Sequence, residues 1–258
     1  LLDEARQQLY HEADYVHEAE LLQSFHAFLE EDERFVVPAV VEELSSKRIL
    51  TMEFLHGEPI ETIETLETAR RNEAARRLTE LAFREVFDWG LVQTDPNFAN
   101  YLYEKETGRI QLLDFGAARE HDREKRAAMR LLLGACMEDS DRAILDAAGQ
   151  LGYLGEGDPA GYADAVLLLL RTATGPLRAT TPYRFGSSDL AQKMGEIVSE
   201  MRLQSKYSRI PPMDILFLHR KLGGLYLLLS RLRATLDIGK LAKPYLQLSA
   251  IQVSDNAA

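Results

Sequence analysis

Cysteine is almost absent from the 258-residue sequence, which contains Cys136 and no other. One cysteine cannot form an internal disulfide or supply a cysteine cluster for a metal, so the chain fits a reducing compartment or a fold that needs no oxidation. The neighbours Ala135 and Met137 favour a small buried hydrophobic side chain over a reactive thiol.

Long apolar runs are also missing. The run Val166–Leu170 stops at Arg171, and residues 216–232 contain four basic side chains, whereas a membrane-spanning helix needs roughly 18 apolar residues. We therefore expect no membrane span. Residues 1–6 include two acids and do not resemble a secretory signal.

Basic charge is in deficit, with 30 Lys and Arg residues against 41 Asp and Glu residues and a net charge of −11. This balance disfavours a surface that neutralises nucleic-acid phosphates, and we expect no nucleic-acid partner. Because 46% of the residues are hydrophobic, the chain can bury a core as one large domain, or as a domain with a small lobe.

Hydrophobic spacing predicts a mostly helical chain of the α+β class. Apolar residues keep helical spacing from residue 1 to about Glu31, and the lack of a clear N-cap suggests that something precedes this helix. Residues 34–44 and 48–55 predict a β-hairpin beside it. A second helix is predicted over residues 72–89 and ends at Gly90.

Short extended segments are predicted next, and long helices after them. The extended segments are 91–94, 101–103 and 110–113, and the turn between the last two contains Thr107 and Gly108. The later helices are predicted at 123–137, 142–151, 161–173, 190–204 and 213–236. Only the last residues, 254–258, have the composition of a free tail.

Asp95 and Asn100 have the spacing of a kinase catalytic loop, within Gln93-Thr94-Asp95-Pro96-Asn97-Phe98-Ala99-Asn100. Alone this pairing is weak, because Asp-Pro and Asn-rich segments are common turns. The order becomes informative because Asp114-Phe115-Gly116 follows two extended runs and a turn, where a kinase has its second magnesium-binding aspartate.

These side chains suit magnesium-assisted phosphoryl transfer. Asp114 follows an apolar run, where a carboxylate needs a cation or hydrogen bonds to offset its desolvation. Asn100 and Asp114 are the candidate Mg²⁺ ligands, and nucleotide phosphates would supply further oxygen ligands. Asp95 is the candidate base for the attacking hydroxyl or water, and Gly116 lets the backbone turn.

The first helix carries Glu12, Asp14 and Glu18, and a kinase needs one helical glutamate to pair with its ATP-contacting lysine. A solvated acidic face is the ordinary alternative. The i and i+4 spacing of Asp14 and Glu18 is mildly repulsive, and a cation would relieve it. The first lysine of the chain is Lys47, so no candidate partner precedes the helix.

Two further features are assigned by position. Glu53-Phe54-Leu55 lies where a kinase hinge offers backbone groups to adenine, although an ordinary strand end is the alternative. Gly223 and Gly224 lie inside a helical run and do not follow a strand, so we expect them to permit close helix packing rather than to bind phosphate.

Three segments resemble the UbiB family of atypical kinases, also called the AarF-domain family. They are Glu12-Ala13-Asp14-Tyr15 through Glu18-Ala19, Gln93 to Asn100, and Leu112 to Ala117. The Gln-Thr-Asp-Pro-Asn form of the loop is similar to the branch that supports coenzyme Q biosynthesis. The resemblance runs from Leu1 to about Tyr245 and includes His219-Arg220-Lys221.

The resemblance implies a protein-kinase-like fold that binds ATP and Mg²⁺ and acts as an ATPase or small-molecule kinase. Residues 1–55 would be a remnant of the N-lobe with the hinge, residues 56–248 a large helical C-lobe, and residues 249–258 a tail. In the family, Glu12 and Asp14 would partner a lysine motif from an N-terminal extension, and Glu18 would partner the ATP lysine. The extension, the nucleotide loop and that lysine lie outside this sequence, so the chain alone is expected to turn over little ATP.

The resemblance also implies a nucleotide partner, a quinone precursor or lipid, and peripheral membrane contact. The expected location is cytoplasmic, or peripheral on the inner membrane and on the matrix side in a mitochondrion. Two alternatives stay open. One is a phosphotransferase of the antibiotic-kinase type, which usually has His where this chain has Gln93. The other is a non-catalytic pseudokinase scaffold that binds lipid or protein partners.

Overall fold

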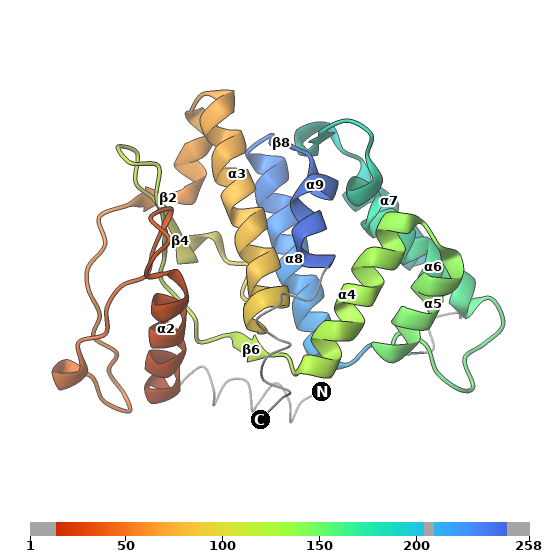
Figure 1. Ribbon diagram of the computed structural model, residues 1–258, viewed down its shortest axis with the longest axis horizontal. Coiled ribbons are helices and arrows are strands. Elements are labelled where there is room, and N and C mark those ends of the chain that lie inside the picture. The colour runs from red at the N-terminus through yellow and green to blue at the C-terminus, as the bar shows by residue number, and fades with distance from the viewer. Residues whose placement is uncertain (1–13, 204–208, 247–258) are drawn as a thin grey trace.

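The structure is a computed structural model that describes residues 14–203 and 209–246. In Figure 1, α2 and short strands lie on the left, α3 and α8 run side by side through the centre, and α4 to α7 lie on the right. The predicted α+β, mostly α fold class is therefore confirmed in the described part of the chain.

The helices and strands have the following bounds. The α-helices are α2 (Tyr15–Leu29), α3 (Thr68–Phe83), α4 (Arg123–Glu138), α5 (Asp141–Gln150), α6 (Tyr162–Ala173), α7 (Leu190–Leu203), α8 (Met213–Arg231) and α9 (Ile238–Ala242). The strands are β1 (Phe35–Val36), β2 (Glu58–Pro59), β3 (Leu91–Gln93), β4 (Tyr101–Tyr103), β5 (Ile110–Leu112), β6 (Ala118–Glu120), β7 (Tyr183–Arg184) and β8 (Thr235–Leu236).

Helix α2 begins at Tyr15 because Asp14 is its N-cap. The Asp14 carboxylate accepts hydrogen bonds from the backbone N–H groups of Val16 (3.2 Å) and His17 (3.4 Å). Asp14 itself has non-helical backbone angles, so the prediction of one continuous helix through this position is wrong. Glu12 lies outside the described residues.

The predicted hairpin of residues 34–55 is wrong as a regular ladder. Strand β1 pairs in parallel with β5, with Phe35 opposite Ile110, instead of pairing with the next run of the chain. Residues 40–52 make only isolated antiparallel bridges, one of them between Val40 and Met52. Pro38 has no N–H to donate to a ladder, and the exposed Ile49 gives no buried face to hold a register.

Helix α3 starts at Thr68, four residues before the predicted start, and continues as a π-helical segment, η3 (Arg84–Trp89). Gly90 then ends the helix as predicted, in the left-handed conformation with φ of 69°. A Cβ atom at this position would lie 2.9 Å from the His121 carbonyl oxygen, so a side chain would also be crowded. The turn directs the chain into β3.

Two strand pairs bring the catalytic-loop segment and the Asp114 turn together. Strands β4 and β5 are antiparallel with Tyr101 opposite Leu112, within a sheet of order β1-β5-β4-β2. Strands β3 and β6 are antiparallel with Gln93 opposite Ala118. The predicted strands near 91–94, 101–103 and 110–113 are therefore present, and residues 94–100 and 113–117 connect the same two strand pairs.

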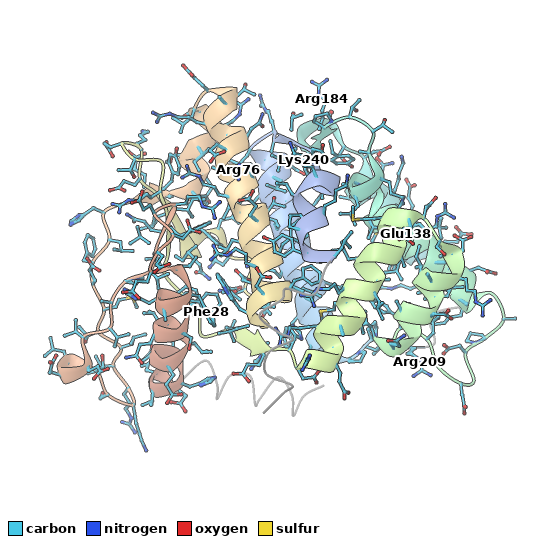
Figure 2. The ribbon with its side chains drawn as sticks, viewed as in Figure 1. Phe28, Arg76, Glu138, Arg184, Arg209 and Lys240 are labelled. Carbon is cyan, nitrogen blue, oxygen red and sulfur yellow. The ribbon has the colours of Figure 1, made fainter. Side chains whose placement is uncertain are left out.

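Aromatic rings hold α2 against this strand region. Phe25 is fully buried and stacks on Phe115 with ring centroids 4.2 Å apart. Phe28, labelled in Figure 2 on the side of α2 that faces the rest of the molecule, stacks on Trp89 at 4.7 Å. Large aromatic surfaces contribute much of the apolar burial in a core, so these two pairs position α2 relative to the Asp114 turn.

Helix α8 crosses the catalytic-loop segment at a glycine. A Cβ atom on Gly224 would lie only 2.2 Å from Cβ of Pro96, whereas Gly223 has no neighbour within 4 Å. The predicted close packing is confirmed at Gly224 and not at Gly223. The helix ends at Arg231, five residues before the predicted end, because the chain reverses at Arg233 (φ 51°) and enters β8.

Burial agrees with the expectation for the single cysteine. Cys136 is fully buried, as predicted, and burial raises the pKa of its thiol. In the described ranges, we find no helix with both the length and the apolar composition needed to cross a bilayer.

The two adjacent glycines of α8 should respond oppositely to alanine. Gly223→Ala should raise the free energy of unfolding by about 0.5–1 kcal/mol, because alanine restricts the unfolded chain and this site is open. Gly224→Ala should lower it by about 1–3 kcal/mol, because the new methyl group collides with Pro96. Urea unfolding of both variants measures the difference. Equal stability of the two variants would contradict the close approach of α8 to the loop.

Candidate functional site

The Asp95 carboxylate is held through both of its oxygens. The Asn100 side-chain amide donates to Oδ2 at 2.8 Å, and a terminal N–H of Arg220 donates to Oδ1 at 2.7 Å. The short 3-10 helix η4 (Phe98–Asn100) brings Asn100 back towards Asp95, and the Asn97 side chain caps it by accepting from the Ala99 N–H. The predicted pairing of Asp95 and Asn100 therefore has a compact local geometry.

Gln93 connects the Asp95 segment to the Asp114 turn. Its side-chain N–H donates to the Asp114 carbonyl oxygen at 2.9 Å, and its side-chain oxygen accepts the backbone N–H of Asp95. The neighbouring Thr94 hydroxyl donates to the Ala117 carbonyl oxygen at 2.6 Å. Gln93 and Thr94 are both buried, so these hydrogen bonds are costly to lose.

The Asp114 turn brings a second carboxylate close to the first helix. Asp114 Oδ1 accepts the backbone N–H of Gly116 at 3.0 Å, and Phe115 is buried between them in the chain. A Cβ atom at Gly116 would lie 3.4 Å from the Glu18 carboxyl carbon. A methyl group here would make ordinary van der Waals contact with Glu18, and the Gly116 backbone is not in the left-handed region, so this turn does not itself require glycine.

Glu18 is the titratable group that this arrangement perturbs. Partial burial raises the pKa of its carboxyl group, and the negative charge of Asp114 raises it further. The sequence predicted a repulsive pair of Asp14 and Glu18, but Asp14 caps the helix and Asp114 is the charge that acts on Glu18. A cation between Glu18 and Asp114 would relieve this repulsion.

The structure thus brings together Asp95, Asn100, Asp114 and Glu18, four of the predicted site residues. The contacts described above do not include the predicted hinge residues, Glu53 and Leu55. Glu53 is exposed in an irregular segment, and its N–H donates to the Ala39 carbonyl oxygen at 2.8 Å. Adenine binding at Glu53 and Leu55 stays a prediction.

A magnesium site here would depend on oxygen ligands from outside the protein. The described residues contain no group of three or more His, Cys, Asp or Glu side chains placed to hold a metal. Asn100 and Asp114 are nevertheless adjacent at the ends of β4 and β5, where the Leu113 N–H donates to the Asn100 carbonyl oxygen. Their amide and carboxylate oxygens suit Mg²⁺, which usually shares its coordination with phosphates and water.

A buried ion pair beneath the loop was missed by the sequence analysis. Lys221 on α8 lies 2.9 Å from the Glu85 carboxylate, with 5% of the lysine side chain and 2% of the glutamate side chain exposed. Glu85 also accepts the backbone N–H of Gln93 at 3.1 Å, and the Lys221 ammonium contacts the Tyr101 hydroxyl at 3.4 Å. Burial opposes the ammonium form of Lys221, but the attraction of Glu85 outweighs it and raises the pKa of Lys221.

The sequence pattern places Arg220 only within the segment His219-Arg220-Lys221 and gives no role to Glu85. One signal could have found the pair: each charge stands within an apolar helical pattern, and buried charges are rarely unpaired. Periodicity alone could not say that the two helices meet.

Removing one member of the buried ion pair should destabilise the protein more than removing both. Lys221→Met leaves the Glu85 carboxylate buried without its cation and should lower the free energy of unfolding by about 3–5 kcal/mol. The double variant Glu85→Gln, Lys221→Met should recover part of this loss. Denaturant unfolding of the single and double variants gives the coupling energy, and purely additive losses would contradict the interaction.

Glu18→Gln should stabilise the protein at neutral pH. Because the folded-state pKa of Glu18 is raised, ionising it costs folding free energy as the pH rises above the ordinary glutamate range. The melting temperature of the variant should exceed that of the parent at pH 7, and the difference should vanish near and below pH 4.5. The gain should be less than about 1 kcal/mol, because solvent screens the partly exposed carboxylate. Glu31→Gln, an exposed change just beyond the end of the same helix, is the control and should change the melting temperature little.

Comparison with known proteins agrees with this geometry. Residues 1–148 match the ABC1 atypical kinase-like domain. The chain is 35% identical to the mitochondrial atypical kinase COQ8B of Rattus norvegicus, over 90% of this chain and 44% of that protein. It is 31% identical to the mitochondrial atypical kinase COQ8 of Saccharomyces cerevisiae, over 93% of this chain and 48% of that protein. The chain thus spans less than half the length of these relatives.

A solved structure supports the fold. The structure of a complex of Rv3197 with erythromycin from Mycobacterium tuberculosis matches with a TM-score of 0.71 at 20% identity, and the match covers 94% of this chain and 60% of that one. With the domain match, it confirms the predicted protein-kinase-like fold. The predicted resemblance to the UbiB atypical kinases is confirmed as well, and the chain belongs to the ABC1 atypical kinase-like family.

Proposed function

We propose that this chain binds Mg-ATP and acts in phosphoryl transfer, as an atypical kinase or ATPase that supports ubiquinone (coenzyme Q) biosynthesis. The observation that carries the proposal is the meeting of the Asp95–Asn100 pair with the Asp114 turn through Gln93. The biosynthetic role rests on the relatives, several of which are named atypical kinases of the COQ8 type.

Each site residue then has a chemical role. Asn100 and Asp114 would hold Mg²⁺, which offsets negative charge on the phosphates when it is bound. Asp95 accepts the proton of the attacking hydroxyl or water, and the hydrogen bond from Asn100 orients its carboxylate for this step. Glu18 would pair with a lysine ammonium near the phosphates, which would also relieve its repulsion by Asp114.

The division into lobes and the partners follow as part of the same proposal. Residues 1–55 would contribute N-lobe elements and a hinge, in which Glu53 and Leu55 contact adenine through the backbone. Residues 56–248 would form the C-lobe. The phosphoryl acceptor would be a quinone precursor or another lipid, met by peripheral contact at the matrix side of the mitochondrial inner membrane, since the relatives are named as mitochondrial.

Asp114→Asn tests the metal role in the proposed function. The change removes a ligand charge and keeps nearly the same shape, so it should weaken Mg-ATP binding by about tenfold or more and leave the melting temperature almost unchanged. Calorimetry with Mg²⁺ present measures the affinity, in a version of the protein extended by the segment that supplies the ATP lysine.

Asp146→Asn is the matched control, because Asp146 is an exposed aspartate on α5, away from the described site. It should bind Mg-ATP like the parent. An Asp114→Asn protein that binds Mg-ATP as tightly as the parent would refute the metal role of Asp114.

A further inference from the structure

Arg220 is the basic side chain that the fold brings to the candidate base. It extends from α8 and donates to Asp95 Oδ1 at 2.7 Å. The next residue, Lys221, is fixed in the core by Glu85, and Gly224 one turn later lies against Pro96. The rotation and height of α8 are therefore set within the helical turn that follows Arg220, and these contacts direct Arg220 towards Asp95.

The charge balance of the site calls for such a cation. Asp95, Asp114 and the partly buried Glu18 all bring negative charge to the region, and the loop sequence from Asp95 to Asn100 contains no lysine or arginine. A transferring phosphoryl group adds more negative charge. Phosphoryl-transfer sites commonly stabilise it with an arginine that comes from another element of the fold.

Arg220 also has more N–H donors than its one hydrogen bond uses. Arginine carries five N–H donors in a planar fork that matches the oxygens of a phosphate group. In the described residues, Arg220 makes one hydrogen bond, to Asp95, and 45% of its side chain is exposed. Lys221 beside it is almost fully buried and cannot reach a ligand in the same way.

We propose that Arg220 binds the phosphoryl group that is transferred, and that its ion pair with Asp95 is the resting arrangement it leaves when nucleotide binds. This inference rests on the proposed function and adds a residue to it. The guanidinium would move from the carboxylate to the phosphoryl oxygens, a short rearrangement for a half-exposed side chain. Asp95 would then be free to accept a proton.

The step balances with groups already named. The bond between the terminal phosphorus and its bridging oxygen breaks, and the electron pair leaves on that oxygen with the diphosphate. A new bond forms between phosphorus and the oxygen of a hydroxyl or water, whose proton goes to the Asp95 carboxylate. Arg220 forms no covalent bond, and it stabilises the charge on the three non-bridging oxygens.

The test compares nucleotides that differ only in the terminal phosphate. Arg220→Gln should weaken Mg-ATP binding by about tenfold or more and change Mg-ADP binding by less than about twofold, because only ATP presents the group that Arg220 contacts. Arg220→Lys keeps the charge but loses the planar fork, so its Mg-ATP affinity should fall between the two. Calorimetry on the parent and variants gives all the affinities, and thermal unfolding confirms that each is folded.

Arg231→Gln is the matched control, since Arg231 is on the same helix, is 48% exposed and pairs with Glu61 and Glu64. It should leave both affinities unchanged. If Arg220→Gln weakens Mg-ATP and Mg-ADP equally, or neither, Arg220 only positions Asp95 and the inference is wrong while the proposed function survives. If the parent binds neither nucleotide, the proposed function fails and this inference fails with it.

Discussion

The buried ion pair between Lys221 and Glu85 is the interaction on which the site depends. Two charges that are almost fully removed from water are tolerated only when their geometry is satisfied, and here Glu85 also accepts the Gln93 N–H while Lys221 contacts the Tyr101 hydroxyl. The pair therefore joins a helix near the end of the chain to the strands that enter and leave the catalytic loop. A slide or rotation of α8 would break these contacts, so the position of the catalytic loop depends on the packing of the core.

The Asp114 turn is fixed from the opposite side, by packing rather than charge. Phe115 is stacked on Phe25 of α2, and this contact carries Glu18 of the same helix towards Asp114. A Cβ atom at Gly116 would be in ordinary van der Waals contact with the Glu18 carboxyl group, which shows how close the Asp114 turn lies to this helix. The apolar contact thus holds α2 where Asp114 and Glu18 repel each other. Perturbed pKa values of this kind cluster at functional sites.

The sequence allowed the local parts of this site to be predicted and not its long-range contacts. The Asp95 to Asn100 spacing, the Asp114 turn and the Gly90 helix end were predictable because each depends on residues close in the chain. The prediction of the hairpin was wrong because the exposed side chains of this segment provide no buried face that would fix a strand register. Arg220 and Asp95 are 125 positions apart, and helical periodicity shows which side of α8 is buried without showing what covers it.

The π-helical end of α3 has a consequence for how this family can vary in length. Residues Arg84 to Trp89 form a wider turn than an α-helix, and the segment contains both Glu85 and Trp89, the residues that meet Lys221 and Phe28. An α-helix turns about 100° per residue, so losing one residue here would rotate the side chains that follow it within this helix by roughly that angle. Insertions and deletions should therefore be tolerated in the exposed 42–50 segment long before they are tolerated in this turn.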